Sequence, residues 1–415
     1  MTTVKKLGIT VVLLWTFGVT IMRGIRFPSG FALAHWVIDY RFGLVKRGLV
    51  GSILSLTTNI MHMHPTEQLI NILSIIVFTV YCLVLIALGL RIIHRAGWST
   101  VVILTVLVFF SSPFIVMSAK LIGHFDNMII VLLVISVILL LKGRIWSAAW
   151  VQVISVLIHE ISLLVAFPNF CLAWLLVNSK HQESDSVKLP FRPLLLPVGA
   201  FLVLALISRL FLSGDFNQAL SKHLSDFPFA VVEPIWFAKI FTTSPYTLFM
   251  SERVNFINRI SSVSMYGLVL PSLSAILCSI LDTHNIQHCE RKSIVLLGSV
   301  CLAPQMIHLV ATDTTRIWTY SILCAFIALW IYAEVFTARR DVSPSIMLLC
   351  LTALIVNILS LTPFWIPGWG EVDVDHFRLK TRLLLYSPVI VTALALMLRQ
   401  EFVLIKKNFS KTFFA

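Results

Sequence analysis

The chain has 415 residues, of which 58% are hydrophobic and 12% charged, and its mean hydropathy is +0.93. A soluble domain carries about 25% charged residues, so this composition excludes an ordinary globular enzyme. Apolar runs of roughly 18 residues recur along the whole length, which indicates a polytopic helical membrane protein.

The net charge is +13, from 32 Lys and Arg against 19 Asp and Glu. This excess suits loops that lie on anionic headgroups or bind phosphate, and the hydropathy argues against nucleic acid as a partner. The seven cysteines lack the spacing of a zinc site or of a disulfide framework.

Hydropathy predicts about twelve membrane spans, beginning with an uncleaved first span and with both termini on one side. The predicted ranges are 7–25, 68–90, 100–119, 127–141, 145–160, 162–178, 193–213, 264–281, 293–312, 317–336, 344–362 and 383–398. The short apolar range 48–63 is expected to lie in the membrane interface, because a crossing there would move the later positive loops to the side opposite Lys5 and Lys6.

The sequence therefore predicts an all-α fold, a single transmembrane domain over residues 1–415 with interfacial helices in the first outer loop. Three outer loops are expected to shape a site, at 26–67, 214–262 and 363–382. The second of these contains the aromatic residues Phe227, Phe229, Trp236, Phe237 and Tyr246.

The first outer loop has an unusual charge cluster: Asp39 is followed by Arg41, Lys46 and Arg47 between two apolar segments. Three further polar groups are expected at the same end of the bundle: His124 with Asp126, His159 with Glu160, and Asp313 with Arg316. The sequence around Glu160 is so apolar that an ionised carboxylate there needs a partner.

Each group also has a purely structural interpretation. Asp126 and Asp313 are placed to cap the helices that follow them. His159 and Glu160 could form a hydrogen-bonded pair between helices. The Asp39 cluster could be an interfacial anchor, and Arg23 is expected to snorkel to headgroups.

No familiar catalytic or nucleotide motif is present. His159-Glu160 is not a metalloprotease signature, because position 163 is Leu rather than His. There is neither a Gly-rich phosphate loop nor a dinucleotide fingerprint. We expect no cofactor, although a divalent metal bound by His124, Asp126, His159 and Glu160 stays an alternative that spacing along the chain does not decide.

In organisation, the first 160 or so residues resemble the GT-C superfamily of integral-membrane glycosyltransferases, which use polyprenyl-linked sugars. Asp39 matches the first-loop catalytic acid of that superfamily, and Asp126 matches its second-loop acid. The chain departs from the pattern because its first-loop motif is Asp-Tyr-Arg rather than paired acids, and because no large soluble C-terminal domain follows.

The resemblance implies sugar transfer from a polyprenyl-phosphate donor to a glycan or glycolipid acceptor, within the membrane and on the periplasmic face of a bacterial inner membrane. Asp39 would be the general base, with Glu160 as second choice and Asp126 orienting the acceptor or the base. The positive side chains Arg41, Lys46, Arg47 and Arg316 would bind the phosphate. His124, His159 and Asp313 are further candidates for substrate binding.

Two other functions stay open. An O-antigen-type polymerase or ligase would also use outer-loop arginines, on a diphosphate-linked saccharide. A transporter or flippase would need charges near the bilayer midplane and matched halves with broken helices. Prolines interrupt several spans, but no repeat relates the halves, and most carboxylates lie at helix ends.

Overall fold

A computed structural model describes residues 2–43, 45–183, 189–211, 214–229, 233–243, 245–283, 291–311, 313–337, 343–366 and 370–413. Apart from one two-stranded antiparallel hairpin, the regular structure of these residues is helical. The helices of the first half are α1 (Thr3–Gly24), α2 (Gly30–Val37), η1 (Tyr40–Phe42), α3 (Gly48–Ile60), α4 (Glu67–Arg95), α5 (Thr100–Phe110), α6 (Pro113–Lys120), α7 (Asp126–Leu141), α8 (Ile145–Ile158), α9 (Ser162–Val165), α10 (Phe167–Glu183), η2 (Arg192–Leu194) and α11 (Leu195–Phe211).

The second half adds α12 (Gly214–Ser225), α13 (Pro234–Thr242), α14 (Pro245–Glu252), η3 (Arg253–Asn255), α15 (Phe256–Ile260), α16 (Val263–Thr283), α17 (Arg291–Leu302), η5 (Ala303–Leu309), α18 (Thr314–Val335), α19 (Pro344–Leu359) and α20 (Leu379–Phe413). The strands β1 (Pro363–Ile366) and β2 (Gly370–Asp373) form the hairpin, with Pro363 opposite Asp373. This hairpin lies in the predicted loop 363–382.

In the described part of the chain, seven helices are long and apolar enough to cross a membrane, which indicates a membrane protein. The same residues include six further apolar helices of 10–17 residues, which cover the shorter predicted spans and the range 48–63. Each of the twelve predicted ranges therefore contains helix, while the count of twelve crossings stays a prediction.

The centre of the bundle is formed by α18 and by the α5 and α6 pair. In the most apolar stretch of each, 94% of the residues are buried, against 28% for α20. Phe109 of α5 and Phe326 of α18 stack with their ring centroids 3.6 Å apart. Side chains this deeply packed fix the two central helices against each other.

The predicted span 100–119 is broken between α5 and α6, because Pro113 has no N–H and begins a new helix. The break leaves the Val108 carbonyl without its usual helical partner. Asn357 of α19 compensates by donating from Nδ2 to this carbonyl at 3.0 Å and to Ser111 Oγ at 3.1 Å. A polar side chain from α19 therefore stabilises the interruption inside the apolar core.

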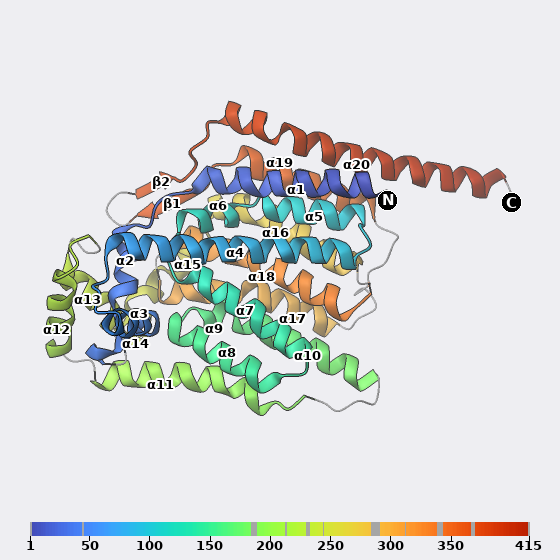
Figure 1. Cartoon of the computed structure of the whole chain (residues 1–415). Helices are drawn as coiled ribbons and strands as arrows, with labels where there is room; N and C mark the ends of the chain where they lie inside the picture. Colours follow the sequence, from blue (N-terminus) through green and yellow to red (C-terminus); the bar gives the residue numbers. More distant parts are fainter. Residues whose placement is uncertain are drawn as a thin grey trace.

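Figure 1 shows that the bundle has two different ends. The start of α1 and the end of α20 lie at one end, and α2, α3, α12, α13 and the hairpin lie at the other. All three predicted outer loops thus gather at one end, which we call the loop end. In this view α3 is seen nearly along its axis, whereas α1 and α4 run across the picture.

Arg23 does not snorkel as expected. Its side chain is 1% exposed and pairs with Asp375, which is 0% exposed, through Nε and Oδ1 at 2.5 Å and Nη2 and Oδ2 at 3.1 Å. It also donates to the carbonyls of Asn357 and Ser360. This ion pair fastens the segment after the hairpin to α1 and α19.

We predict that Arg23→Met lowers the free energy of unfolding by about 3–5 kcal/mol, because it leaves the Asp375 carboxylate buried without its cation. Thermal or SDS-induced unfolding in nanodiscs measures this. The control is Arg91→Met, since Arg91 is 56% exposed and its partner Glu334 keeps Arg95; we expect at most about 1 kcal/mol there. Equal effects of the two variants would contradict a structural role for the buried pair.

Candidate functional site at the loop end

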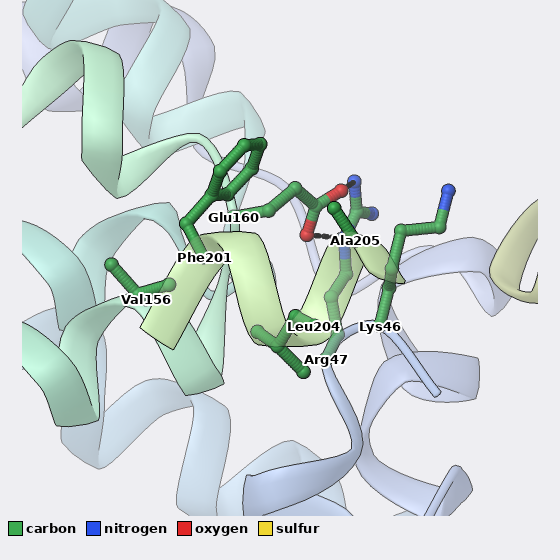
Figure 2. A pocket seen from close by; sticks show the side chains of 7 residues that line it. All are labelled: Lys46, Arg47, Val156, Glu160, Phe201, Leu204 and Ala205. Atoms are coloured by element: carbon green, nitrogen blue, oxygen red, sulfur yellow. Dashed lines mark hydrogen bonds and ion pairs between the residues drawn. The ribbon is translucent and has the colours of Figure 1, made fainter. Parts of the chain in front are cut away.

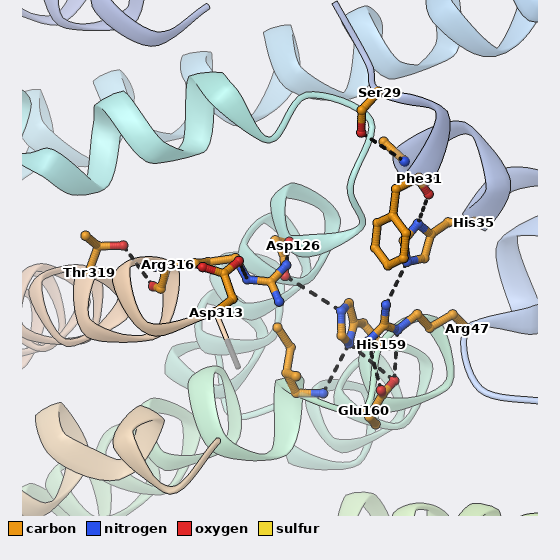
Figure 3. Close-up of polar contacts among 12 residues, drawn as sticks. Ser29, Phe31, His35, Arg47, Asp126, His159, Glu160, Asp313, Arg316 and Thr319 are labelled. Atoms are coloured by element: carbon orange, nitrogen blue, oxygen red, sulfur yellow. Dashed lines mark hydrogen bonds and ion pairs between the residues drawn. The ribbon is translucent and has the colours of Figure 1, made fainter. Parts of the chain in front are cut away.

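Arg47 connects three parts of the chain at the loop end (Figure 3). Its guanidinium donates from Nη2 to Glu160 Oε1 at 3.0 Å, from Nε to Glu160 Oε2 at 3.3 Å, and from Nη1 to His35 Nε2 at 2.7 Å. It also lies over the Phe241 ring of α13, 5.7 Å from its centroid. One side chain thus contacts α2, the break after α8, and α13, which lies over the site.

The backbone at Arg47 is strained. Its φ of 64° is in the left-handed region, where a residue with a Cβ costs about 1–3 kcal/mol. Arg47 is also the residue that precedes α3, and Gly51 lets that helix lie against the chain at Ile38, whose carbonyl oxygen a Cβ would strike. Packing of α3 therefore imposes the conformation that aims Arg47 at Glu160.

His35 is held neutral by its two partners. Because Arg47 donates to Nε2, the ring proton belongs on Nδ1, which donates to the Phe31 carbonyl at 2.8 Å. Complete burial and the neighbouring Arg47 charge lower the pKa of His35 well below its usual value. The ring contacts His124 and Phe241, with centroids 5.5 and 5.1 Å away.

His159 and Glu160 form the break between α8 and α9. His159 adopts an extended conformation that ends α8, and its Nδ1 accepts the Ile161 N–H at 3.3 Å. Nδ1 also lies 3.3 Å from Glu160 Oε2, while Nε2 faces Asp126 Oδ1 at 3.8 Å. A single buried imidazole therefore separates two carboxylates.

The charges around this break shift the pKa values of both residues. Burial raises the pKa of Glu160, but Arg47, His159 and Lys46 outweigh it and hold the pKa well below the usual value. Burial and Arg47 lower the pKa of His159. At neutral pH the site contains an ionised Glu160 beside a neutral His159.

Asp126 lies at the other side of His159, at the start of α7. Its Oδ2 is 3.5 Å from Arg316 Nη1, and Arg316 Nε is 3.2 Å from Asp313 Oδ2. Asp313 caps α18 as predicted, accepting the Arg316 N–H at 3.4 Å. Asp126 does not cap α7, since neither of its oxygens accepts a hydrogen bond in the described part of the chain.

Asp39 is only 1% exposed and is bound by Arg41, whose Nη2 lies 2.6 Å from Oδ2. It also caps η1 through the Arg41 N–H at 2.9 Å. Among the described residues, no ion pair joins Asp39 to Lys46, Arg47 or Arg316. The structure thus divides the sequence cluster, with Arg41 turned to Asp39 and Arg47 to Glu160.

Two cavities adjoin these groups. The first, which we call the lysine cavity, is lined by Lys46, Arg47, Val156, Glu160, Phe201, Leu204 and Ala205 (Figure 2). The second, the aspartate cavity, includes Asp126, Arg316 and Tyr320 in its wall. Glu160 borders the first and Asp126 the second, with His159 between them.

The outer loop 214–262 covers this site. His223 of α12 donates from Nε2 to the Val37 carbonyl at 2.9 Å, and its ring contacts Phe42 and Phe227. Phe241 of α13 is buried against His35. Of the predicted aromatics, the side chains of Trp236 and Phe237 lie outside the described part of the structure, and Tyr246 is 54% exposed.

The predicted residues are thus placed in two groups. One group gathers around the two cavities and consists of Lys46, Arg47, His124, Asp126, His159, Glu160, Asp313 and Arg316. The other group, Asp39 with Arg41, lies apart from the ion pairs of the first. Sequence reasoning missed His35, Phe241 and Tyr320. A histidine or aromatic residue inside an apolar helix gives no periodic signal that would separate it from the core.

Within the described residues, no group of three or more His, Cys, Asp or Glu side chains is placed to hold a metal ion. The carboxylates of Asp126 and Glu160 instead face Arg316 and Arg47. Comparison of the chain with protein-family models, with curated proteins and with solved structures gives no match.

We predict that the protein loses stability as the pH falls from 6.5 to 4.5. Burial lowers the pKa of His124 to about 3, and His35 and His159 are lowered too. Below pH 6.5 the unfolded chain binds protons at these histidines that the folded protein does not bind. Each histidine therefore lowers the free energy of unfolding by at most about 1.4 kcal/mol per pH unit. The stability that ionised Glu160 contributes is lost only below the usual pKa of this carboxyl, 4.5.

His124→Gln should therefore flatten the dependence of Tm on pH between 6.5 and 4.5, because one proton uptake on unfolding is removed. Thermal unfolding in nanodiscs at four pH values across this window measures the slope. Identical slopes for the variant and the wild type would contradict a neutral, buried His124.

Proposed function

We propose that this protein is a membrane glycosyltransferase. It moves a sugar from a polyprenyl-phosphate-linked donor to a glycan or lipid-linked acceptor, on the extracytoplasmic face and, by the resemblance above, the periplasmic face of a bacterial inner membrane. The support comes from one cavity that suits a lipid phosphate and an adjacent carboxylate that suits a general base.

Lys46 is the observation that carries the proposal. The side chain is 7% exposed, yet the described residues give its ammonium no hydrogen bond or ion pair. Figure 2 shows it beside the Arg47–Glu160 pair, with no dashed line to its nitrogen. A buried ammonium without a partner is costly, so an anion bound in the lysine cavity would stabilise it.

The charge and the lining of the lysine cavity suit a phosphate that carries an apolar chain. Lys46 and Arg47 against Glu160 leave one positive charge in excess, while Phe201, Leu204 and Ala205 of α11 form an apolar wall. Leu202, Val203 and Leu206 on the same helix are exposed, as expected for a helix that faces lipid. A polyprenyl phosphate could thus place its headgroup on the cations and its chain along α11.

In the proposed reaction, a carboxylate takes the proton of an acceptor hydroxyl while its oxygen forms a bond to the sugar C1. The bond from C1 to the phosphate oxygen breaks at the same time, and the phosphate leaves with the electron pair. Lys46 and Arg47 stabilise the charge on the departing phosphate.

We assign the base role to Asp126. Arg41 binds both oxygens of Asp39, and Arg47 binds both oxygens of Glu160, whereas Asp126 accepts no hydrogen bond in the described structure. Asp39, which the sequence favoured as the base, is instead proposed to position the loop that leads to Lys46. Glu160 is proposed to orient Arg47 and His159.

A lipid-linked saccharide transporter, and a polymerase or ligase that uses diphosphate-linked saccharides, are the alternative functions. A transporter would bind the same lipid phosphate without breaking the C1–oxygen bond. Release of free polyprenyl phosphate by the reconstituted protein separates transfer from transport, and a requirement for a diphosphate donor would favour the polymerase or ligase.

We predict that binding of farnesyl phosphate weakens as the pH rises through 8. Burial lowers the pKa of Lys46 to about 8 although Glu160 raises it, so the ammonium loses its proton above that pH. The Kd in nanodiscs should rise by up to about tenfold per pH unit between 8 and 9.5. Over this range the second ionisation of the phosphate, with a pKa of about 6, is complete.

Lys46→Arg is the matched control, because a guanidinium stays charged and should keep Kd constant over this pH range. Lys46→Met should weaken binding by about tenfold or more at pH 7 and abolish the pH dependence. If Lys46→Met binds as tightly as the wild type, the lysine cavity is not the phosphate site.

We predict that Asp126→Asn lowers kcat by about 10²–10⁴-fold, the usual contribution of a general base. Asp39→Asn should lower it much less. The assay follows release of polyprenyl phosphate from radiolabelled polyprenyl-phosphate hexoses by protein in liposomes. A larger loss with Asp39→Asn than with Asp126→Asn would return the base role to Asp39.

A further inference from the structure

Two cations lie in the turn between α7 and α8, one helix length away from the His159–Glu160 break. Lys142 and Arg144 flank Gly143, whose φ of 75° closes the turn. Both cations are exposed, and within the described part of the structure neither side chain has an ion pair or a hydrogen bond. Arg144 also precedes the positive end of the α8 dipole, so nothing in the turn compensates its charge.

Arg192 adds a third cation beside the start of α8. It begins η2, which packs against α8, and the following α11 runs alongside α8 in Figure 1. Two side chains of α10 hold the preceding segment: Trp174 Nε1 donates to the Pro190 carbonyl at 3.3 Å, and Asn178 Oδ1 accepts the Leu189 N–H at 2.8 Å. Arg192 is exposed and has no described partner either.

Exposed aromatic residues accompany these cations. Trp146 and Trp150 lie one turn apart on α8 and are 52% and 56% exposed, and Ile154 continues the same face. Phe191, next to Arg192, is 58% exposed. Exposed apolar side chains of a membrane helix face lipid, and tryptophan is enriched at the level of the headgroups. The cations therefore lie where phosphate groups meet the apolar chains.

Other cations at the end of the bundle where α1 starts do have partners in the described structure. Arg91 and Arg95 pair with Glu334, and Lys180 donates to the Val335 carbonyl. Lys6 lies over the Trp98 ring, 5.5 Å from its centroid. The cations beside α8 thus differ from these neighbours, because the described protein supplies no group that neutralises them.

We propose that the start of α8 binds the headgroup of an anionic phospholipid. The site, which we call the α8 patch, consists of Lys142, Arg144, Arg192, Trp146, Trp150 and Phe191. The lipid phosphate lies among the three cations, and an acyl chain follows Trp150 and Ile154 along α8. A zwitterionic lipid carries its own ammonium, which weakens its attraction to the cations, so charge complementarity selects an anionic headgroup. This lipid site is separate from the proposed transfer reaction, which uses the opposite end of α8.

The test measures lipid binding to the purified full-length protein by native mass spectrometry. The probes are phosphatidylglycerol and phosphatidylethanolamine with the same acyl chains. Phosphatidylglycerol should bind saturably to the wild type, with a Kd at least about tenfold below that of phosphatidylethanolamine. The double variant Arg144→Gln, Arg192→Gln should raise the Kd of phosphatidylglycerol by about tenfold to thirtyfold, because each cation near a lipid headgroup contributes about fivefold.

The matched control is the double variant Lys6→Gln, Arg91→Gln, which loses the same net charge at the same end of the bundle. Its Kd for phosphatidylglycerol should stay within about twofold of the wild type. Trp146→Ala should raise the Kd of both lipids several-fold and preserve the preference for phosphatidylglycerol, because it removes an apolar contact and no charge.

The arginines of the test variant are exposed and unpaired in the described structure, so their replacement should leave Tm in detergent unchanged. Equal Kd values of the two lipids for the wild type would overturn the inference. The same increase of Kd in both double variants would also overturn it, since net charge rather than the α8 patch would then set the affinity.

Discussion

The ion pair between Arg47 and Glu160 is the interaction on which the loop end depends. Glu160 lies at a helix break surrounded by apolar residues, where an ionised carboxylate without a partner would be very costly. Arg47 supplies that partner from the first outer loop and at the same time binds His35 and contacts Phe241. The left-handed backbone at Arg47 is tolerated because three separate segments hold its guanidinium. This one side chain therefore links the cover to the helix break.

Interrupted helices create the polar site inside an otherwise apolar bundle. The α8 helix stops at Ile158 and α9 starts at Ser162, so His159 and Glu160 are free of helical geometry and can face inward. A similar interruption at Pro113 is stabilised by Asn357. Backbone irregularity in a membrane protein needs such internal partners. One break thus lies in the central α5 and α6 pair, and the other lies between α8 and α9.

Much of the fold could be predicted from the sequence, because an apolar helix forms its backbone hydrogen bonds internally and can be recognised from its composition. The need of Glu160 for a partner was also predictable, but the identity of that partner was not. Arg41, Lys46 and Arg47 all follow Asp39 closely in sequence, yet in the described part of the structure only Arg41 pairs with it. The turn before α3 directs Arg47 to a residue 113 positions away. The hairpin at 363–373 was missed because a Pro, Trp and Gly-rich segment predicts turns rather than strands. His35 and Tyr320 were missed because only tertiary packing shows what they face.

The arrangement of charge around His159 bears on how a proton could move. Nδ1 of His159 lies 3.3 Å from both the Ile161 N–H and the Glu160 carboxylate, and Nε2 faces Asp126 at 3.8 Å, so one ring stands between two carboxylates that compete for its proton. In the proposed reaction, an acceptor hydroxyl that gives its proton to Asp126 would leave a neutral acid there, and a carboxylic acid no longer attracts Arg316 as the carboxylate did. The guanidinium of Arg316 would then turn more fully to Asp313, which already lies 3.2 Å from its Nε. Protonation of Asp126 would thus remove one of the two carboxylates that hold Arg316, whereas Asp39, with both oxygens bound by Arg41, could not undergo this change without losing its partner.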